Sequence, residues 1–253
     1  MRSRGFAGIV EETGALAFLT LRAFAALVRP PYEIGLWVRQ MEQIGVRSLG
    51  VASITTIFTG MVLALQTAYS LPSLGIKYYI GSVVSKSLVR ELGPVLTALI
   101  VGGRIGSGMT AEIGSMKVTE QIDALRSMAA DPVKKLVVPK LVATLVMLPA
   151  LTVIGDALGI LGGLIVATFT LNLPAGLYIN DVLASLTLAD VVSGVAKSFF
   201  FGYFIAIVGC YNGLNTTGGA DGVGRATTNT VVLAAILVLI SDFFLTKLFY
   251  LMA

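Results

Sequence analysis

The sequence contains no histidine, one cysteine and few charged residues, and each shortage excludes a class of function. Without histidine, the chain lacks the usual general base, the most common metal ligand and any HExxH motif. Cys210 alone can form neither an internal disulfide nor a cysteine metal cluster. No GxxxxGK[ST] phosphate loop occurs, so energy for any work must come from a partner or an ion gradient. We therefore predict no catalytic residue, no metal ligand and no cofactor in this chain.

Hydrophobic residues are abundant instead: they make up 56% of the 253 residues, against 13% charged residues. Several apolar runs reach about 20 residues, the length that crosses roughly 30 Å of hydrocarbon as a helix. The 28 glycines suit helices that pack closely in lipid. The composition predicts an all-α polytopic membrane protein with one membrane domain over residues 1–253.

Residues 1–47 are predicted to form helices at the membrane interface, ahead of the first span. On a helical wheel of residues 1–29, charged side chains share one stripe and apolar side chains occupy the opposite side. The charged residues of this stripe are Arg4, Glu11, Arg22 and Arg29. Pro30-Pro31 should end this helix, and a second short helix should follow. The alternative for residues 1–29 is an uncleaved signal anchor.

Five transmembrane spans are predicted, at residues 48–71, 92–111, 136–169, 191–211 and 230–251. The segment between the second and third spans, 112–135, is predicted to lie in the cytosol. The third span is long for one crossing and contains Pro149, so it is expected to be tilted, kinked or extended. A hairpin there is rejected because two crossings need about 40 residues plus a turn.

The basic residues predict the orientation of the chain. Segments 1–47 and 103–140, together with Arg225, hold thirteen of the eighteen Lys and Arg residues. All thirteen fall on one side if the N-terminus is cytosolic and the spans number five. The C-terminus is then periplasmic.

A short charged segment, TEQIDALRSM at residues 119–128, follows the second span and is too polar to enter the bilayer. Acidic residues near its start suit a helix N-terminus, and Thr119 is the expected N-cap. Ile122, Leu125 and Met128 mark an apolar face at helical spacing. The pattern fits a coupling helix in a groove of an ATPase and fits an amphipathic cytosolic linker equally well.

Two glycine-rich features have structural explanations. Gly155, Gly159 and Gly163 make one smooth helix face, for which packing within one subunit is favoured over a dimer contact. The segment 212–228 lacks the lysine and the context of a nucleotide loop, so it is predicted to be a flexible cytosolic turn.

Ionisable residues inside spans are costly and are therefore candidates for function. Glu91, Lys197 and Asp242 can reach similar depths in the outer half of the membrane, and Arg90 adjoins them. We predict a buried polar cluster with Glu91–Lys197 as its ion pair; the alternative is a purely structural staple of the bundle. Asp156 and Arg104 have no partner that the sequence identifies.

Two blocks of the sequence resemble the MlaE (YrbE) permease family: RELGPVLTALIVGGRIGSGMTAEIGSMKVTEQIDAL with the following Asp131-Pro132, and GGADGVGRATTNTVV at 218–232. Its members are the permease subunits of Mla-type ABC transporters, which move phospholipid between the inner and outer membranes and maintain outer-membrane lipid asymmetry. The resemblance implies a homodimer in the bacterial inner membrane. It also implies a cytosolic ABC ATPase dimer that binds ATP and Mg, a STAS-domain protein and a periplasmic MCE-domain hexamer.

The resemblance also assigns residues. It implies a coupling helix that contacts the ATPase, formed by Glu120, Gln121, Ile122, Asp123, Ala124 and Leu125. Lipid would occupy an outward-facing cavity between the subunits. The residues implied near that cavity are Arg90, Glu91, Lys197, Asp242, Leu65 and Tyr69.

Other functions remain open from the residues. An ABC permease could carry another hydrophobic cargo, such as a sterol or a fatty acid. An ion-coupled carrier could use Glu91, Lys197 and Asp242 as a relay, although five spans without an inverted repeat disfavour it. A membrane enzyme is disfavoured because no nucleophile with a base is recognisable.

Overall fold

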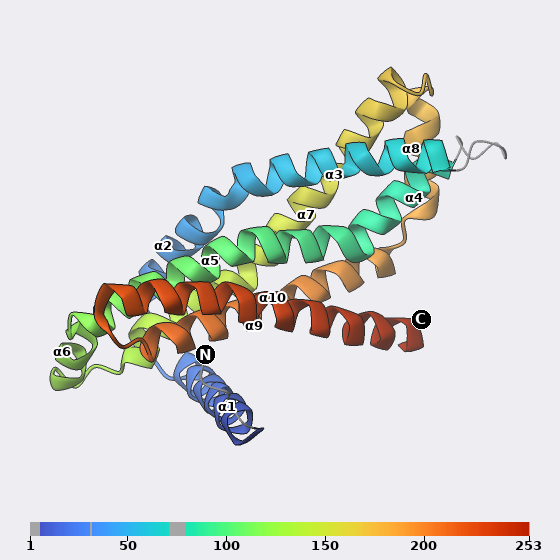
Figure 1. The fold of residues 1–253 in the computed structure, drawn as a ribbon. Helices are drawn as coiled ribbons and strands as arrows, with labels where there is room; N and C mark the ends of the chain where they lie inside the picture. The colour runs from blue at the N-terminus through green and yellow to red at the C-terminus, as the bar shows by residue number, and fades with distance from the viewer. Residues whose placement is uncertain (1–5, 31, 71–78, 253) are drawn as a thin grey trace.

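The computed structural model describes residues 6–30, 32–70 and 79–252, and this part of the chain is built from helices. In chain order the elements are α1 (Phe6–Val28), α2 (Ile34–Ile44), η1 (Val46–Ser48), α3 (Leu49–Ser70), α4 (Ile80–Ser87), η3 (Leu88–Leu92), α5 (Gly93–Val118), α6 (Gln121–Ser127), η4 (Val133–Val137), α7 (Val138–Phe169), α8 (Ala175–Ser185), α9 (Leu188–Leu214) and α10 (Gly219–Met252). The long helices form an elongated bundle with α6 at one end and α8 at the other (Figure 1). Four residues named or counted in the predictions lie outside the described residues: Arg2 and Arg4 of the basic N-terminal segment, Pro31 at the expected helix end and Leu71 at the end of the first predicted span.

Five stretches are long and apolar enough to cross a membrane: 34–70, 80–118, 133–169, 188–214 and 219–251. Each contains one of the predicted spans, apart from Leu71. The helices run further than the predicted spans because α5 and α10 continue past the apolar windows at the α6 end. The protein is thus a multi-pass membrane protein with five spans.

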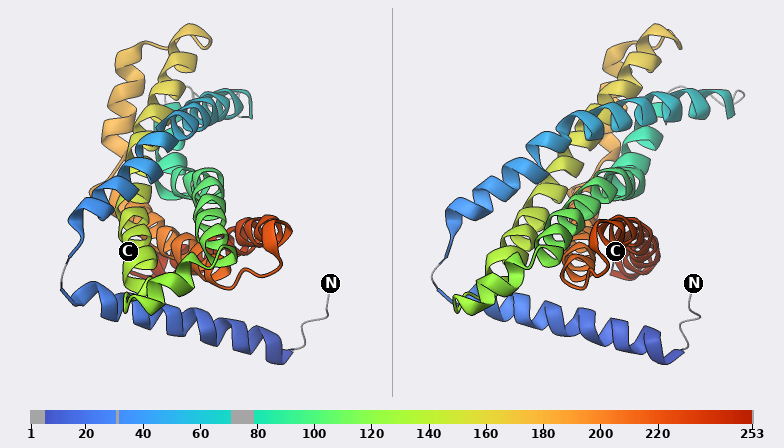
Figure 2. Two further views of the ribbon diagram at one scale, coloured as in Figure 1. Left: turned by 90° about the vertical axis from the view of Figure 1, so that its left-hand side faces the viewer. Right: turned by 60° about the vertical axis from the view of Figure 1, so that its left-hand side comes forward.

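Helix α1 lies crosswise to the five spans, beneath the end of the bundle that carries α6 (Figure 2). It buries Leu19, Ala23 and Ala26 and leaves Phe18 and Leu21 exposed. A hydrogen bond of 2.8 Å between Thr20 Oγ1 and the hydroxyl of Tyr203 attaches it to α9. This is the arrangement expected of a helix in the membrane interface.

Close contacts of small residues hold the bundle together. Helix α3 packs along α7, where a Cβ at Gly60 would overlap the backbone of Gly159. A Cβ at Gly155 would lie 2.9 Å from the side chain of Thr56, and one at Gly163 would meet the Tyr178 hydroxyl at 2.5 Å. The glycine face of α7 therefore packs within the chain, as predicted. Helix α5 packs between α9 and α10 and completes the core.

Three connections between the predicted spans contain helical residues. The segment 212–228 was expected to be a flexible turn, but α9 extends to Leu214 and α10 begins at Gly219. Positive φ angles at Gly218 and Gly219, of 87° and 66°, make the short connection possible. The connections at the end of the bundle opposite α6 hold α4 and α8, which pack against each other (Figure 1). Neither was predicted, because 8 and 11 residues are too short to give a clear periodic pattern.

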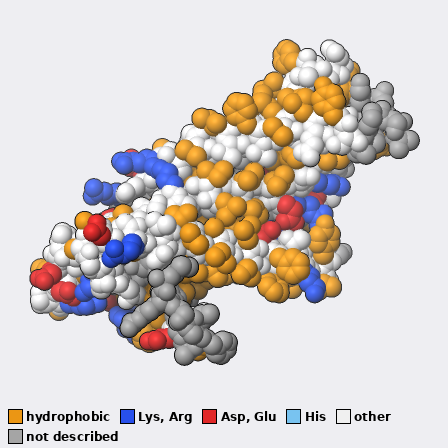
Figure 3. All heavy atoms as spheres, in the orientation of Figure 1, with side chains coloured by type: hydrophobic (Ala, Val, Ile, Leu, Met, Phe, Trp, Pro, Cys, Tyr) orange, Lys and Arg blue, Asp and Glu red, His pale blue; other side chains and the backbone are white. Residues whose placement is uncertain are grey.

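The surface shows where the charges gather. Figure 3 shows hydrophobic side chains over the middle of one face and a concentration of charged side chains at the end that carries α6. A smaller group of charged side chains interrupts the hydrophobic surface toward the opposite end. These two polar regions contain most of the predicted site residues.

Candidate functional site

The first polar region, the outer cluster, surrounds Lys197 of α9, whose side chain is only 2% exposed. Its ammonium donates to Glu91 Oε2 at 2.6 Å, to Thr246 Oγ1 at 2.6 Å and to the carbonyl of Arg90 at 3.0 Å. Asp242 Oδ1 lies 3.2 Å from the same nitrogen. The predicted ion pair between Glu91 and Lys197 is therefore present, and Asp242 joins it. One lysine ties together η3, α9 and α10.

The local sequence explains why Lys197 fits here. Pro94 has no N–H, so the carbonyl of Arg90 lacks its regular donor four residues on, and Lys197 supplies one instead. Gly194 lies against the carbonyl of Val89 so closely that a Cβ would overlap it. This contact brings α9 onto η3 one turn before Lys197.

Arg90 connects the outer cluster to further residues that the sequence did not identify. Its Nε lies 3.5 Å from Asp190 Oδ1, and its guanidinium lies 4.8 Å from the centre of the Tyr250 ring. Asp190 Oδ2 in turn accepts from the N–H of Thr187 at 2.9 Å, in a capping box that begins α9. The positive and negative groups are thus interleaved.

Sequence signals for these missed residues exist. The spacing Thr187-x-x-Asp190 is that of a capping box, which fixes the start of α9. Asp242, Thr246 and Tyr250 are spaced four residues apart, so they share one face of α10. A search for side chains on the face of Asp242 would have found both Thr246 and Tyr250.

The side chains of the outer cluster leave almost no empty space between them. The hollow beside Lys197 and Tyr250 measures about 10 Å³, which is close to the space of one water. Leu65 and Tyr69, predicted to line the same cavity, lie on α3, which packs chiefly on α7. Leu65 is half-buried against the core near α4, and Tyr69 is 73% exposed. The structure does not bring these two residues to Lys197.

The second polar region contains α6, within the predicted segment 119–128. Ile122 is fully buried in the core, Leu125 is half-buried and Met128 is 69% exposed. Glu120, Gln121, Asp123 and Ala124 are exposed. Ile122 therefore anchors α6 to the bundle, and the acidic face stays accessible.

One contact ties α6 to the last turn of α5, and a second lies within α6 itself. Lys117 Nζ donates to Asp123 Oδ2 at 3.0 Å, and the Arg126 guanidinium donates to Asp123 Oδ1 at 2.9 Å. The hydrogen bond from Lys117, with both cations nearby, holds the pKa of Asp123 below its ordinary value of 3.8. The prediction of Thr119 as the N-cap of α6 is wrong. Its hydroxyl donates to the carbonyl of Ser115 at 2.8 Å, and Glu120, with φ of 59°, occupies the cap position.

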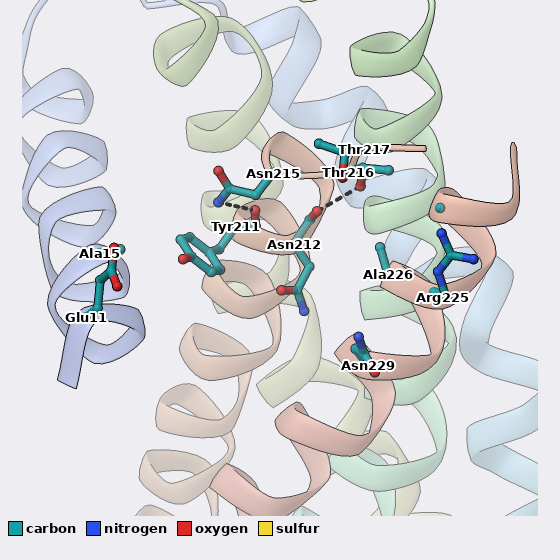
Figure 4. Close-up of a pocket in the computed structure, with 11 residues that line it drawn as sticks. Glu11, Ala15, Tyr211, Asn212, Asn215, Thr216, Thr217, Arg225, Ala226 and Asn229 are labelled. Carbon is teal, nitrogen blue, oxygen red and sulfur yellow. Dashed lines mark hydrogen bonds between the residues drawn. The ribbon is translucent and has the colours of Figure 1, made fainter. Parts of the chain in front are cut away.

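A polar hollow of about 540 Å³ lies between α1 and the corner that joins α9 to α10 (Figure 4). Figure 4 shows Asn212 and Asn215 on α9 and its end, Arg225 and Asn229 on α10, and Glu11 on α1 across the opening. The corner itself is held by Thr216, which is buried and donates to the carbonyl of Asn212 at 2.8 Å.

The two unassigned charges of the sequence lie at different depths. Arg104 on α5 donates to Ser48 Oγ at 2.6 Å, beside the start of α3. Asp156 on α7 is buried, and its Oδ1 has no hydrogen-bond partner among the described residues. Its carboxyl group lies against Gly93, so closely that a Cβ at this glycine would overlap it.

Comparison with known proteins decides the family. The family model described as Permease MlaE matches residues 37–248. The chain belongs to the MlaE permease family. It is 43% identical over 240 residues to a probable ABC transporter permease protein of Rickettsia typhi, covering 95% of this chain and 93% of that one. Its identity to the intermembrane phospholipid transport system permease protein MlaE of Haemophilus influenzae is 35%, covering 96% of this chain and 94% of that one.

A plant relative is also similar: the chloroplastic protein trigalactosyldiacylglycerol 1 of Arabidopsis thaliana, 36% identical over 213 residues. That match covers 84% of this chain and 61% of the plant protein. Membership of the MlaE family makes this chain a permease component of an ABC transporter, a class in which the permease itself is not catalytic. An ABC permease works with an ATPase partner.

Proposed function

We propose that this MlaE-family chain is the permease subunit of an ATP-driven transporter that moves phospholipids between the inner and outer membranes and so maintains outer-membrane lipid asymmetry. It acts in the bacterial inner membrane, with its N-terminus in the cytosol and its C-terminus in the periplasm. Its partners are a second copy of the chain, an ABC ATPase dimer that binds ATP and Mg, a STAS-domain protein and a periplasmic MCE-domain hexamer. The similarity to the intermembrane phospholipid transport system permease protein of Haemophilus influenzae supports phospholipid as the cargo.

The observation that carries this proposal is the attachment of α6. Its exposed carboxylates, Glu120 and Asp123, are accessible to a partner, whereas Ile122 is buried in the core. The salt bridge from Lys117 to Asp123 joins α6 directly to α5. A push by the ATPase on α6 would therefore move α5, whose far end continues through η3 into the outer cluster.

The lipid is proposed to bind outside a single chain. The hollow of about 10 Å³ at the outer cluster is far too small for acyl chains. Only 11% of the apolar window of α10 is buried, so a second copy can cover the rest. The lipid cavity would then lie between two subunits, with Arg90, Glu91, Lys197 and Asp242 at its rim and Leu65 and Tyr69 in its wall.

Another hydrophobic cargo, such as a sterol or a fatty acid, is the second candidate. It is favoured by the exposed apolar side chains along α3 and α10, such as Phe58, Ile236 and Leu239, because a surface of this kind accepts many lipids. The ion-coupled carrier is less well supported, because it leaves the exposed acidic face of α6 without a role.

The test is purification of the chain together with the products of its neighbouring genes, followed by reconstitution into phospholipid vesicles. We expect an ATPase and an MCE protein to copurify, and ATP hydrolysis to be stimulated by phospholipid. The double variant Glu120→Ala/Asp123→Ala should lose this stimulation, because it removes the exposed carboxylates of α6.

Glu42→Ala is the matched control, because it removes an exposed carboxylate from α2 and leaves α6 intact. Full stimulation in the α6 double variant would contradict α6 as the coupling helix. Transport driven by an ion gradient, with no ATPase in the preparation, would contradict the ABC mechanism. Stimulation by sterol or fatty acid but not by phospholipid would select the other cargo.

A further inference from the structure

A cavity of about 580 Å³ opens where α2, α5 and α7 meet the start of α10. Apolar side chains such as Ile44, Ile105 and Met109 share its lining with polar ones, which are Gln40, Gln43, Arg104, Ser107, Glu112, Lys140 and Thr227. It is separate from the outer cluster, because Arg104 follows Glu91 by thirteen residues, or about 20 Å along a helix. We call it the inner cavity.

The charges of the inner cavity do not cancel. Lys140 is buried and pairs with Glu112, its Nζ lying 2.6 Å from Oε2. Arg104 donates to Ser48 Oγ, which carries no charge. Among residues 6–30, 32–70 and 79–252, no carboxylate forms a salt bridge with Arg104. One positive charge therefore faces the cavity without a counter-charge from the described chain, on a helix that crosses the membrane.

The depth of Arg104 matches that of lipid headgroups. Its partner Ser48 directly precedes α3, whose 22 residues span about 33 Å, close to the thickness of the hydrocarbon core. Arg104 thus lies level with one boundary of the hydrocarbon, on the side of α6. Ile100, one turn away on the same face of α5, is 40% exposed and offers apolar surface toward the bilayer.

The inner cavity has room for a ligand beside this arginine. Gly108 lies one turn beyond Arg104 on the same face of α5, and a Cβ added there would meet nothing within 4 Å. A phosphodiester with its first glycerol carbons fits a space of about 580 Å³. A guanidinium binds such a group with two parallel hydrogen bonds.

We propose that the inner cavity binds the phosphodiester of a phospholipid from the leaflet on the α6 side, with Arg104 as the cationic contact. The proposal deepens the proposed function and rests on it for lipid as the cargo. It gives the permease a second lipid site, on the opposite side of the membrane from the outer cluster. Inorganic phosphate shares this chemistry, so the test must separate the two.

The experiment uses the full chain in nanodiscs of phosphatidylethanolamine and phosphatidylglycerol, with the photo-crosslinker p-benzoylphenylalanine in place of Thr227 on the cavity wall. Mass spectrometry measures the phospholipid adduct after illumination. We expect Arg104→Ala to lower the adduct roughly tenfold or more, because it removes a charge-assisted contact. Arg104→Lys should retain part of it.

A steric pair of variants completes the test. Gly108→Leu fills the inner cavity and should lower the adduct, whereas Gly176→Leu, also with open space around it but on α8, should not. Equal adducts in all variants would show unspecific contact with bulk lipid and would overturn the proposal. A crosslink between two chains in place of the lipid adduct would also overturn it, because a second copy would then cover the cavity.

Excess inorganic phosphate distinguishes the source of the anion. Loss of the adduct in phosphate would assign the site to a free anion and overturn the lipid assignment; an unchanged adduct supports it. Wild-type transport, measured separately, tests the proposed function. An Arg104-dependent adduct in a complex that does not move phospholipid would leave the inner site standing while the proposed function failed.

Discussion

The two ends of α5 each meet a buried lysine, and the two sites are built differently. The side chains of Lys197 and Lys140 are both 2% exposed. The Nζ of Lys197 lies 2.6 Å from Glu91 on η3, and the Nζ of Lys140 lies 2.6 Å from Glu112 on α5, the helix that continues from η3. Lys197 also contacts Asp242, so it belongs to a network of three elements. Among the described residues, Lys140 has Gln40, at 3.4 Å, as its further hydrogen-bond partner, and Glu112 is 42% exposed beside a cavity.

This difference indicates that the two ends of α5 are held with different firmness. The outer end is held by several short bonds around one cation, so any movement there must break or exchange them together. The inner end is held by one ion pair, and it lies next to α6. Water reaches the glutamate of both pairs, 37% exposed for Glu91 and 42% for Glu112, so the two ends differ in the number of partners around the lysine. We therefore expect α5 to be stiffly held at the outer end and more easily displaced at the inner end.

The largest effect is expected at the outer end. Lys197→Ala leaves two carboxylates without their cation, Glu91, which is 37% exposed, and Asp242, which is 21% exposed. The cost is therefore below the value of about 3–5 kcal/mol for a fully buried pair, with Asp242 as the larger contributor. We expect loss of transport and a lower melting temperature in a chain that still folds. Lys197→Arg, which keeps a cation, is the control. Transport at the wild-type level in Lys197→Ala would contradict a functional role for the outer cluster.

A smaller effect is expected at the inner end. Lys140→Ala leaves one carboxylate without its cation, and that group, Glu112, is 42% exposed, whereas Lys197→Ala also strands the less exposed Asp242. The melting temperature should therefore fall by less than half of the change in Lys197→Ala, measured in the same detergent. A larger fall than at Lys197 would show that the inner pair, not the outer cluster, holds α5.

Asp156 extends the comparison of the two lysine ion pairs, because it is a buried carboxyl group that has no lysine partner among the described residues. Its unsatisfied Oδ1 costs about 1–3 kcal/mol, and Asp156→Val removes both oxygens at similar volume. We expect the melting temperature to rise in this variant and transport to continue. A fall in transport without a fall in stability would show that the carboxyl group is used, and Asp156→Asn would then test whether its charge matters.

The smallest effect concerns the pH dependence of α6. Because the pKa of Asp123 is lowered by the hydrogen bond from Lys117, its contribution is present above pH 3.8 and is lost as the pH falls through the depressed value. The protection factors of the α6 amides, which correct for the intrinsic pH dependence of exchange, should fall over this range. In Asp123→Asn they should be low already at neutral pH and should lose this dependence. An unchanged wild-type profile would mean that Ile122 alone holds α6.

The sequence predicted those features that depend on composition and on depth. The five spans follow from apolar length, and the pairing of Glu91 with Lys197 follows from counting 1.5 Å per residue along each helix. The partner of Arg104 was not predictable in this way. It depends on how α3 and α5 are tilted and rotated against each other, which the sequence of neither helix contains.

Short helices and caps were the least predictable parts of the fold. Thr119 was a reasonable N-cap by residue type, but it bonds back to α5 because the chain turns through a left-handed residue at Glu120. Leu65 and Tyr69 lie on α3, as predicted, but within the described residues α3 does not approach Lys197. In the proposed function, their role would depend on a second copy.

The missing N–H of Pro94 also limits how this protein can evolve. The carbonyl of Arg90 is satisfied by a side chain from another helix, so the identities of residues 94 and 197 are coupled across the bundle. Any residue with an N–H at position 94 would compete with Lys197 for that carbonyl. Lys197 would then be held less firmly beside the carboxylates of Glu91 and Asp242. Substitutions at the two positions should therefore be epistatic, and relatives that lose the proline are expected to change the lysine or its acidic partners as well.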